Sequence, residues 1–112
     1  MSTNFEPPSH WSPQTDIVVR PGVEVIILLD LPGIQRQHLE LSAESQRLHI
    51  AGDRPDGERG SPATYLRMER PYGPFACSVE VPSDYDIRQA KAVYQNGILR
   101  IVVPARNGNP DR

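Results

Sequence analysis

Proline and glycine interrupt this chain along its whole length. Twelve prolines and eight glycines make up 20 of its 112 residues. Proline removes a backbone donor and glycine weakens both helices and strands, which leaves little room for long helices and favours short strands joined by turns. The length suits one domain with a single core, because a folded chain of this size buries about two thirds of its surface. A multidomain enzyme is therefore excluded.

Apolar and polar residues alternate from residue 16 onward, as they do in β-strands. The segment 23–31 (VEVIILLDL) is apolar throughout one face and over half of the other, which predicts a central strand covered on both sides. The Asn96-Gly97 pair is a strong hairpin signal. We therefore expect an all-β chain of about eight short strands, folded as an antiparallel β-sandwich. The expected strands are 17–19, 23–31, 39–43, 48–52, 65–70, 75–81, 92–94 and 98–103, with one helical turn within 84–90.

One connection is longer than a hairpin needs. Residues 53–64 (DRPDGERGSPAT) form a stretch rich in proline, glycine and charge. A hairpin loop usually has about two to five residues, and a much longer loop in a compact domain is normally either functional or disordered. This loop is therefore the first candidate functional segment.

Charge and composition exclude several kinds of partner. The formal net charge is −2 and aromatic residues make up 6% of the chain, so we expect no binding to nucleic acid or to an anionic membrane. Cys77 is the single cysteine, and the first residues lack the apolar segment of a secretory signal, which favours a reducing, cytoplasmic location. The sequence shows no zinc-ligand spacing and no nucleophile with a base beside it, so we expect neither a cofactor nor catalysis.

A set of short segments carries a family resemblance. The segments 30–33 (DLPG), 69–75 (ERPYGPF) and 92–99 (AVYQNGIL) occur in a fixed order and spacing, with 48–52 and 101–104 as further matching parts. Together they resemble the α-crystallin domain of small heat shock proteins. The resemblance implies an immunoglobulin-like β-sandwich. Its expected divisions are a flexible arm, 1–13, the α-crystallin domain, 14–104, and a short polar tail, 105–112.

The same resemblance implies an ATP-independent holdase chaperone, which binds unfolded or partly unfolded proteins and suppresses their aggregation. It also implies a homodimer in which the loop 53–64 carries an extra strand, here 61–65, that pairs with the partner's N-terminal strand. Such an exchange covers two open sheet edges at once. For residues 69 and 70, an ion pair between subunits and a surface pair of little effect are the two alternatives. The expected interface residues are Ser61, Ala63, Tyr65, Trp11, Glu69 and Arg70.

The resemblance further implies an apolar groove between the strands 39–43 and 90–94, which accepts an I-x-I/V motif from a neighbouring subunit. Strand parity alone does not fix which side chains face this groove, so packing in the core remains the alternative for about half of the candidates. The candidate groove residues are Leu39, Leu41, Ala43, Ala90, Ala92 and Val93.

Two features depart from the family pattern. The tail 105–112 contains no I-x-I/V motif and the N-terminal arm is short, so we expect a dimer or a small oligomer. Cys77 stands where the family often has arginine, two residues after Phe75. We expect Cys77 to be a buried small hydrophobe, with a reactive thiol as the alternative.

Two other functions remain as alternatives. The first is an adaptor domain related to the CS/p23 sandwich, which binds one folded partner. The second is an enzyme that uses Cys77 or a histidine. The long loop 53–64 and the corner 69–73 favour the chaperone, because a monomeric adaptor needs no exchanged strand.

Overall fold

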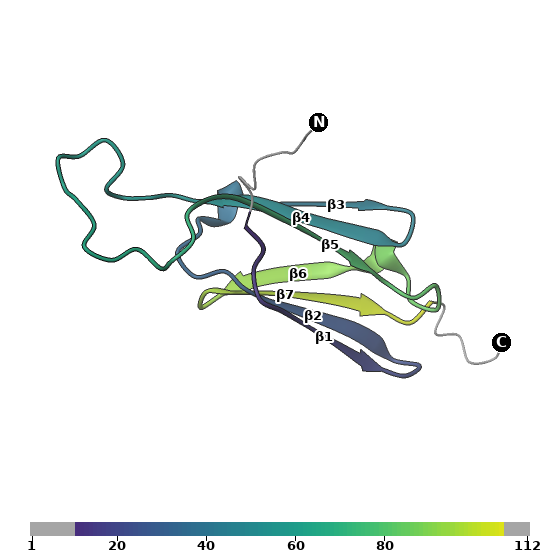
Figure 1. Cartoon of the computed structure of the whole chain (residues 1–112). Helices are drawn as coiled ribbons and strands as arrows, with labels where there is room; N and C mark the ends of the chain where they lie inside the picture. The colour runs from purple at the N-terminus through teal and green to yellow at the C-terminus, as the bar shows by residue number, and fades with distance from the viewer. Residues whose placement is uncertain (1–10, 107–112) are drawn as a thin grey trace, which may run out of the picture.

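The computed structural model describes residues 11–106. The first ten residues of the expected arm and the expected tail after Arg106 lie outside this range. Residues 11–106 form seven strands and two single-turn 3-10 helices, which confirms the all-β prediction (Figure 1). No helix in the described range is long and apolar enough to cross a membrane.

The strands form two antiparallel sheets that lie face to face as two layers (Figure 1). The four-stranded sheet has the order β1-β2-β7-β6 and the three-stranded sheet has the order β3-β4-β5. The bounds are β1 (Thr15–Arg20), β2 (Glu24–Asp30), β3 (Glu40–Glu44), β4 (Arg47–Arg54), β5 (Gly73–Glu80), β6 (Lys91–Gln95) and β7 (Ile98–Pro104), with the 3-10 turns η1 (Arg36–His38) and η2 (Ile87–Gln89).

Strand β2 is the central strand that the sequence predicts. It lies between β1 and β7, and its inward residues Val25, Ile27 and Leu29 are completely buried. On its outer face Ile26 is also buried, because the neighbouring Val18 and Val102 flank it in the register. Leu28, also on the outer face, is only half-buried, and within residues 11–106 no third layer packs over it. The second sheet thus covers one face of β2, and the predicted cover on both sides is wrong for the outer face.

The core fills the space between the two sheets. Phe75 of β5 and Ile50 of β4 meet Ile101 of β7 and Leu31, and each of these side chains is almost fully buried. Full burial of one such side chain contributes about 1.5–3 kcal/mol to stability. The core therefore gives this small domain a rigid body without a disulfide.

The turn between β6 and β7 follows the prediction from the sequence. Asn96 and Gly97 have φ values of 56° and 78°, the left-handed conformation that a two-residue hairpin turn requires. A Cβ atom on Gly97 would also lie only 3.2 Å from Pro32. Glycine at this position therefore serves both the turn and the packing of the 30–33 segment.

The prediction of a strand at 65–70 is wrong for the single chain. The described residues therefore form seven strands and not the expected eight. Residues 55–72 contain no strand and swing away from both sheets as one long loop (Figure 1). A strand needs a neighbouring edge for its backbone groups, and this segment pairs with none between residues 11 and 106. The loop is thus longer than the expected 53–64, and we call residues 55–72 the long loop. The strand expected at 61–65 requires a partner chain and stays a prediction.

Candidate protein-binding surfaces

Strand β1 leaves an apolar sheet edge open. Within residues 11–106 it pairs with β2 on one side only. Its residues Ile17, Val18 and Val19 have exposed fractions of 50%, 43% and 47%. Successive residues of a strand point to opposite faces, so β1 is apolar and exposed on both faces as well as unpaired along its edge. Proteins normally charge, shorten or cover such an edge.

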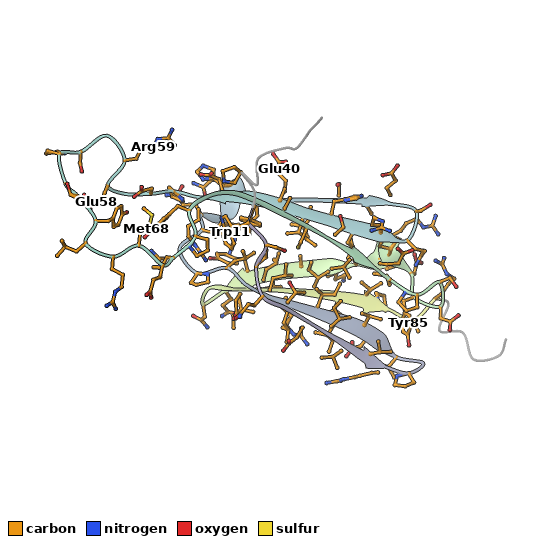
Figure 2. All side chains as sticks on the ribbon, in the orientation of Figure 1. Trp11, Glu40, Glu58, Arg59, Met68 and Tyr85 are labelled. Atoms are coloured by element: carbon orange, nitrogen blue, oxygen red, sulfur yellow. The ribbon has the colours of Figure 1, made fainter. Side chains whose placement is uncertain are left out.

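The long loop carries a second set of exposed apolar side chains. Leu66 is fully exposed, and Met68 and Tyr65 are also in solvent. Figure 2 shows Met68, Glu58 and Arg59 on the part of the loop that projects from the sandwich. Inside the loop, the Tyr65 hydroxyl donates a hydrogen bond to the Asp56 carboxylate, which holds the two sides of the excursion together.

The predicted interface residues fall into two groups. Five of them lie on the exposed long loop: Ser61, Ala63, Tyr65, Glu69 and Arg70. Trp11 lies instead at the base of the loop, against its own sandwich (Figure 2). Its indole Nε1–H donates to the Gly73 carbonyl at 3.0 Å, and its ring contacts Phe75 with a centroid distance of 5.0 Å.

Glu69 and Arg70 do not pair with each other. Glu69 lies 3.9 Å from Arg67 in an exposed contact, while Arg70 donates to the Tyr72 hydroxyl at 2.8 Å. An exposed ion pair of this kind contributes little to stability. An ion pair between subunits at residues 69 and 70 therefore stays a prediction.

A groove runs between the edge strands β3 and β6, at the side of the sandwich opposite β1. It consists of two adjoining hollows of about 310 Å³ and 190 Å³, which share Leu41 and Ala92. The structure brings all six predicted groove residues together along it. Leu39 and Val93 line the first hollow, Ala43 and Ala90 line the second, and the shared pair completes the set. The alanines keep the groove open because their side chains fill little space.

Sequence reasoning missed the ends of this groove. Arg36 and Tyr94 line the first hollow, and the Arg36 guanidinium donates to the Tyr94 carbonyl at 3.2 Å. The Tyr94 hydroxyl in turn donates to the Leu31 carbonyl. Tyr94 lies two residues after Ala92 on β6 and shares its face. The alternation of the strand could therefore have predicted that Tyr94 lines the groove. Lys91 lines the second hollow. Each hollow therefore has one cationic side chain in its wall, Arg36 in the first and Lys91 in the second.

The amino-acid sequence of this chain matches a known family. The model of the Hsp20/alpha crystallin family matches residues 19–112, which is most of the chain. This chain belongs to that family. The small heat shock protein C4 of Rickettsia felis is 31% identical over 108 residues, covering 92% of this chain and 66% of its own length. The 17.8 kDa class II heat shock protein of Zea mays is 33% identical over 89 residues, covering 79% of this chain and 54% of its own length.

A solved structure gives the same result for the fold of this Hsp20 chain. A small heat-shock protein from Xylella fastidiosa superimposes with a TM-score of 0.78 at 30% identity, covering 87% of this chain and 88% of that one. The chain thus spans more than half of the two relatives above and most of the solved one. The α-crystallin sandwich that the resemblance implied is confirmed.

Cys77, the departure from the family pattern, lies on β5 opposite Ile50 and is half-buried against the core. Burial raises the pKa of the Cys77 thiol above its ordinary value. A protonated thiol is a poor nucleophile, so the surroundings suit a packing residue better than a reactive one.

Proposed function

We propose that this Hsp20 chain is an ATP-independent holdase chaperone that binds unfolded or partly unfolded proteins and suppresses their aggregation. The observation that carries the proposal is the apolar, unpaired edge of β1, exposed on both faces beside a fully buried core. Partly unfolded proteins expose apolar side chains and free strand edges, and a surface of the same kind covers them. Binding of this type needs no bond chemistry, no cofactor and no ATP, and the lone thiol suits a cytoplasmic setting.

The dimer of this proposal forms by strand exchange. The long loop of one copy places residues 61–65 along β1 of the other copy, and the symmetric contact covers both open edges. The loop has the reach for this exchange, because about nine extended residues on either side of its tip span roughly 30 Å. Leu66 and Met68, which are exposed in the single chain, then gain an apolar neighbour in Ile17 and Val19.

The groove between β3 and β6 is the second binding surface of the proposal. It takes an extended apolar segment from a neighbouring subunit or a client. Alternate side chains of such a segment point the same way, so two of them enter the two hollows that meet at Leu41 and Ala92.

Light scattering of a heat-sensitive model enzyme tests the proposal directly. The enzyme is heated without ATP, alone and with increasing molar ratios of this chain. The proposal predicts that light scattering falls as this chain is added. It also predicts that this chain stays folded and elutes together with the heated enzyme on gel filtration. Unchanged scattering at several-fold molar excess, together with a monomeric chain, would instead support the adaptor function.

A further inference from the structure

Arg54 is a buried charge with no carboxylate partner among residues 11–106. It is 5% exposed, and among residues 11–106 it is the one buried polar or charged side chain. Its Nε–H donates to the Pro32 carbonyl at 3.0 Å and one terminal nitrogen donates to the Pro71 carbonyl at 3.1 Å. A guanidinium has five N–H donors, so most of the Arg54 donors have no acceptor within the part of the chain that the structure describes. Buried charges are normally paired, so this arrangement needs an explanation.

An aromatic ring covers one face of the Arg54 guanidinium, and a second cation lies on another side. The guanidinium carbon of Arg54 lies 4.3 Å from the centroid of the Trp11 ring, which closes that face by a cation–π contact. Towards Gly33, a second guanidinium approaches. A Cβ placed on Gly33 would lie 3.2 Å from a terminal nitrogen of Arg70 and 3.7 Å from Nε of Arg54. Two cationic groups therefore converge at the one residue whose missing side chain leaves room between them.

The convergence is held in place by neighbouring groups. Arg70 donates to the Tyr72 hydroxyl at 2.8 Å, and its guanidinium carbon lies 5.3 Å from the centroid of that ring. Burial lowers the pKa of Arg54, and the charge of Arg70 lowers it further. Like charges repel, so an anion placed between the two guanidinium groups would relieve this repulsion.

An opening leads from Arg54 to solvent. Arg54 and Tyr72 line a hollow of about 420 Å³ at the base of the long loop. Asp53 and Asp56 also line this hollow. No ion pair within 4.0 Å joins either carboxylate to Arg54 in the described part of the chain. The hollow thus connects Arg54 with solvent, while Arg70 and Gly33 do not line it.

We propose that Arg54 and Arg70 form a binding site for one oxyanion, a carboxylate or a phosphate group, at the base of the long loop beside Gly33. Guanidinium groups bind such anions through two parallel hydrogen bonds, and an anion between two of them replaces repulsion by attraction. The oxyanion has two sources, a free anion or a carboxylate of a second copy of this chain. Because Pro71 and Tyr72 belong to the loop, occupation of the site fixes the position at which the loop leaves the sandwich.

Calorimetric titration of the full chain with inorganic phosphate tests this proposal. Chloride keeps the ionic strength constant, so that general screening does not change during the titration. The parent chain is expected to bind phosphate saturably, and Arg70→Gln is expected to weaken the affinity about tenfold. Arg67→Gln is the matched control, because it removes the same charge from the same loop and its side chain is exposed. It should bind phosphate as the parent does.

A second variant and a second measurement complete the test. Arg54→Lys keeps the charge but loses the planar fork, and it should also weaken phosphate binding while circular dichroism shows an intact fold. Sedimentation in phosphate separates the two sources. A parent dimer that dissociates as phosphate is added, together with a weaker dimer of Arg70→Gln in the absence of phosphate, identifies the partner's carboxylate as the natural ligand. A dimer that neither phosphate nor Arg70→Gln changes identifies a free anion.

Two outcomes would overturn the oxyanion site: no saturable phosphate binding by the parent chain, or equal affinities for Arg70→Gln and Arg67→Gln. The titration contains no client protein. A chain that binds phosphate but does not suppress aggregation would therefore contradict the proposed chaperone function and leave the oxyanion site standing.

Discussion

Ile17 and Ile27 lie directly opposite each other on the neighbouring strands β1 and β2, yet Ile27 is fully buried and Ile17 is half exposed. Both side chains point to the face that meets the second sheet. The three-stranded sheet has one strand fewer than the sheet it covers, so β1 extends past it. Isoleucine therefore belongs to the core at position 27, while at position 17 it forms part of a surface that can bind other chains.

Substitutions at the two positions should separate stability from function. Ile27→Ala creates a cavity in the core and should lower the free energy of unfolding by about 2–5 kcal/mol. Ile17→Lys removes no packed contact from the core and should change it by about 0.5 kcal/mol or less. Urea denaturation measures both values. A large loss of stability in Ile17→Lys would show that β1 is already covered in the free protein.

Substitutions on β1 should affect the suppression of client aggregation more than they affect stability. Ile17→Lys combined with Val19→Lys should abolish the suppression of client aggregation, because two charges then line the edge that clients and the partner loop cover. Asp16→Lys is the matched control on the same strand, since it changes an exposed residue that is already polar. Suppression that survives in the double variant would exclude β1 as the binding edge.

Replacing the long loop should yield a monomer with an intact sandwich. Arg54 and Gly73 are paired partners in the β4–β5 ladder, so an Asn-Gly turn in place of residues 55–72 closes the hairpin without a change in register. The partner's β1 then has no strand to pair with. Sedimentation equilibrium measures the mass, and a persisting dimer in the folded variant would refute strand exchange.

Filling the groove should block only the second surface. Ala92 belongs to both hollows, and Ala92→Trp should fill them and weaken the binding of an apolar peptide by tenfold or more, roughly the effect of losing one buried contact. Gln95→Trp adds the same side chain to an exposed position of β6 and serves as the control. Fluorescence anisotropy of a labelled peptide measures the affinity. Equal binding by both variants would place the peptide elsewhere.

The fold was predictable because alternation and turn residues act locally. The pattern of 23–31 identified the central strand, and Asn96-Gly97 identified the hairpin turn between β6 and β7, since both depend on residues close in sequence. The segment 65–70 has the composition of a strand as well, but a strand also needs an edge to pair with. Whether such an edge is within reach depends on the whole chain, which is why this prediction was wrong.

The candidate sites were predictable only in part. The six groove residues came from the family resemblance. Tyr94 could have been added from its parity with Ala92 on β6, while Arg36 joins the groove through the packing of two sheets that no local pattern encodes. Arg54 was not predicted at all. A charged residue at the end of a strand next to a polar loop has the pattern of a solvated side chain, and its burial follows from the contact with Trp11, 43 positions earlier in the sequence.

Cys77 should react slowly with iodoacetamide at neutral pH, because burial raises its pKa and the reactive thiolate is scarce. The raised pKa also means that the folded state holds this proton more tightly than the unfolded state. The corresponding contribution to stability is present below the ordinary thiol pKa and is lost as the pH rises through the folded value. Labelling rates followed from neutral to alkaline pH, in native buffer and in urea, measure both effects. A native rate equal to the rate in urea would contradict the burial.

Hydrogen–deuterium exchange with a bound client tests most directly whether this sandwich binds other chains through its open edges. The chain is mixed with a partly unfolded model enzyme without ATP, and exchange is followed peptide by peptide. We predict slower exchange of the β1 amides, 15–20, and of the groove strands 40–44 and 91–95, while the amides of β2 stay as protected as before. A stable complex in which β1 and the groove strands exchange as fast as in the free protein would contradict the account.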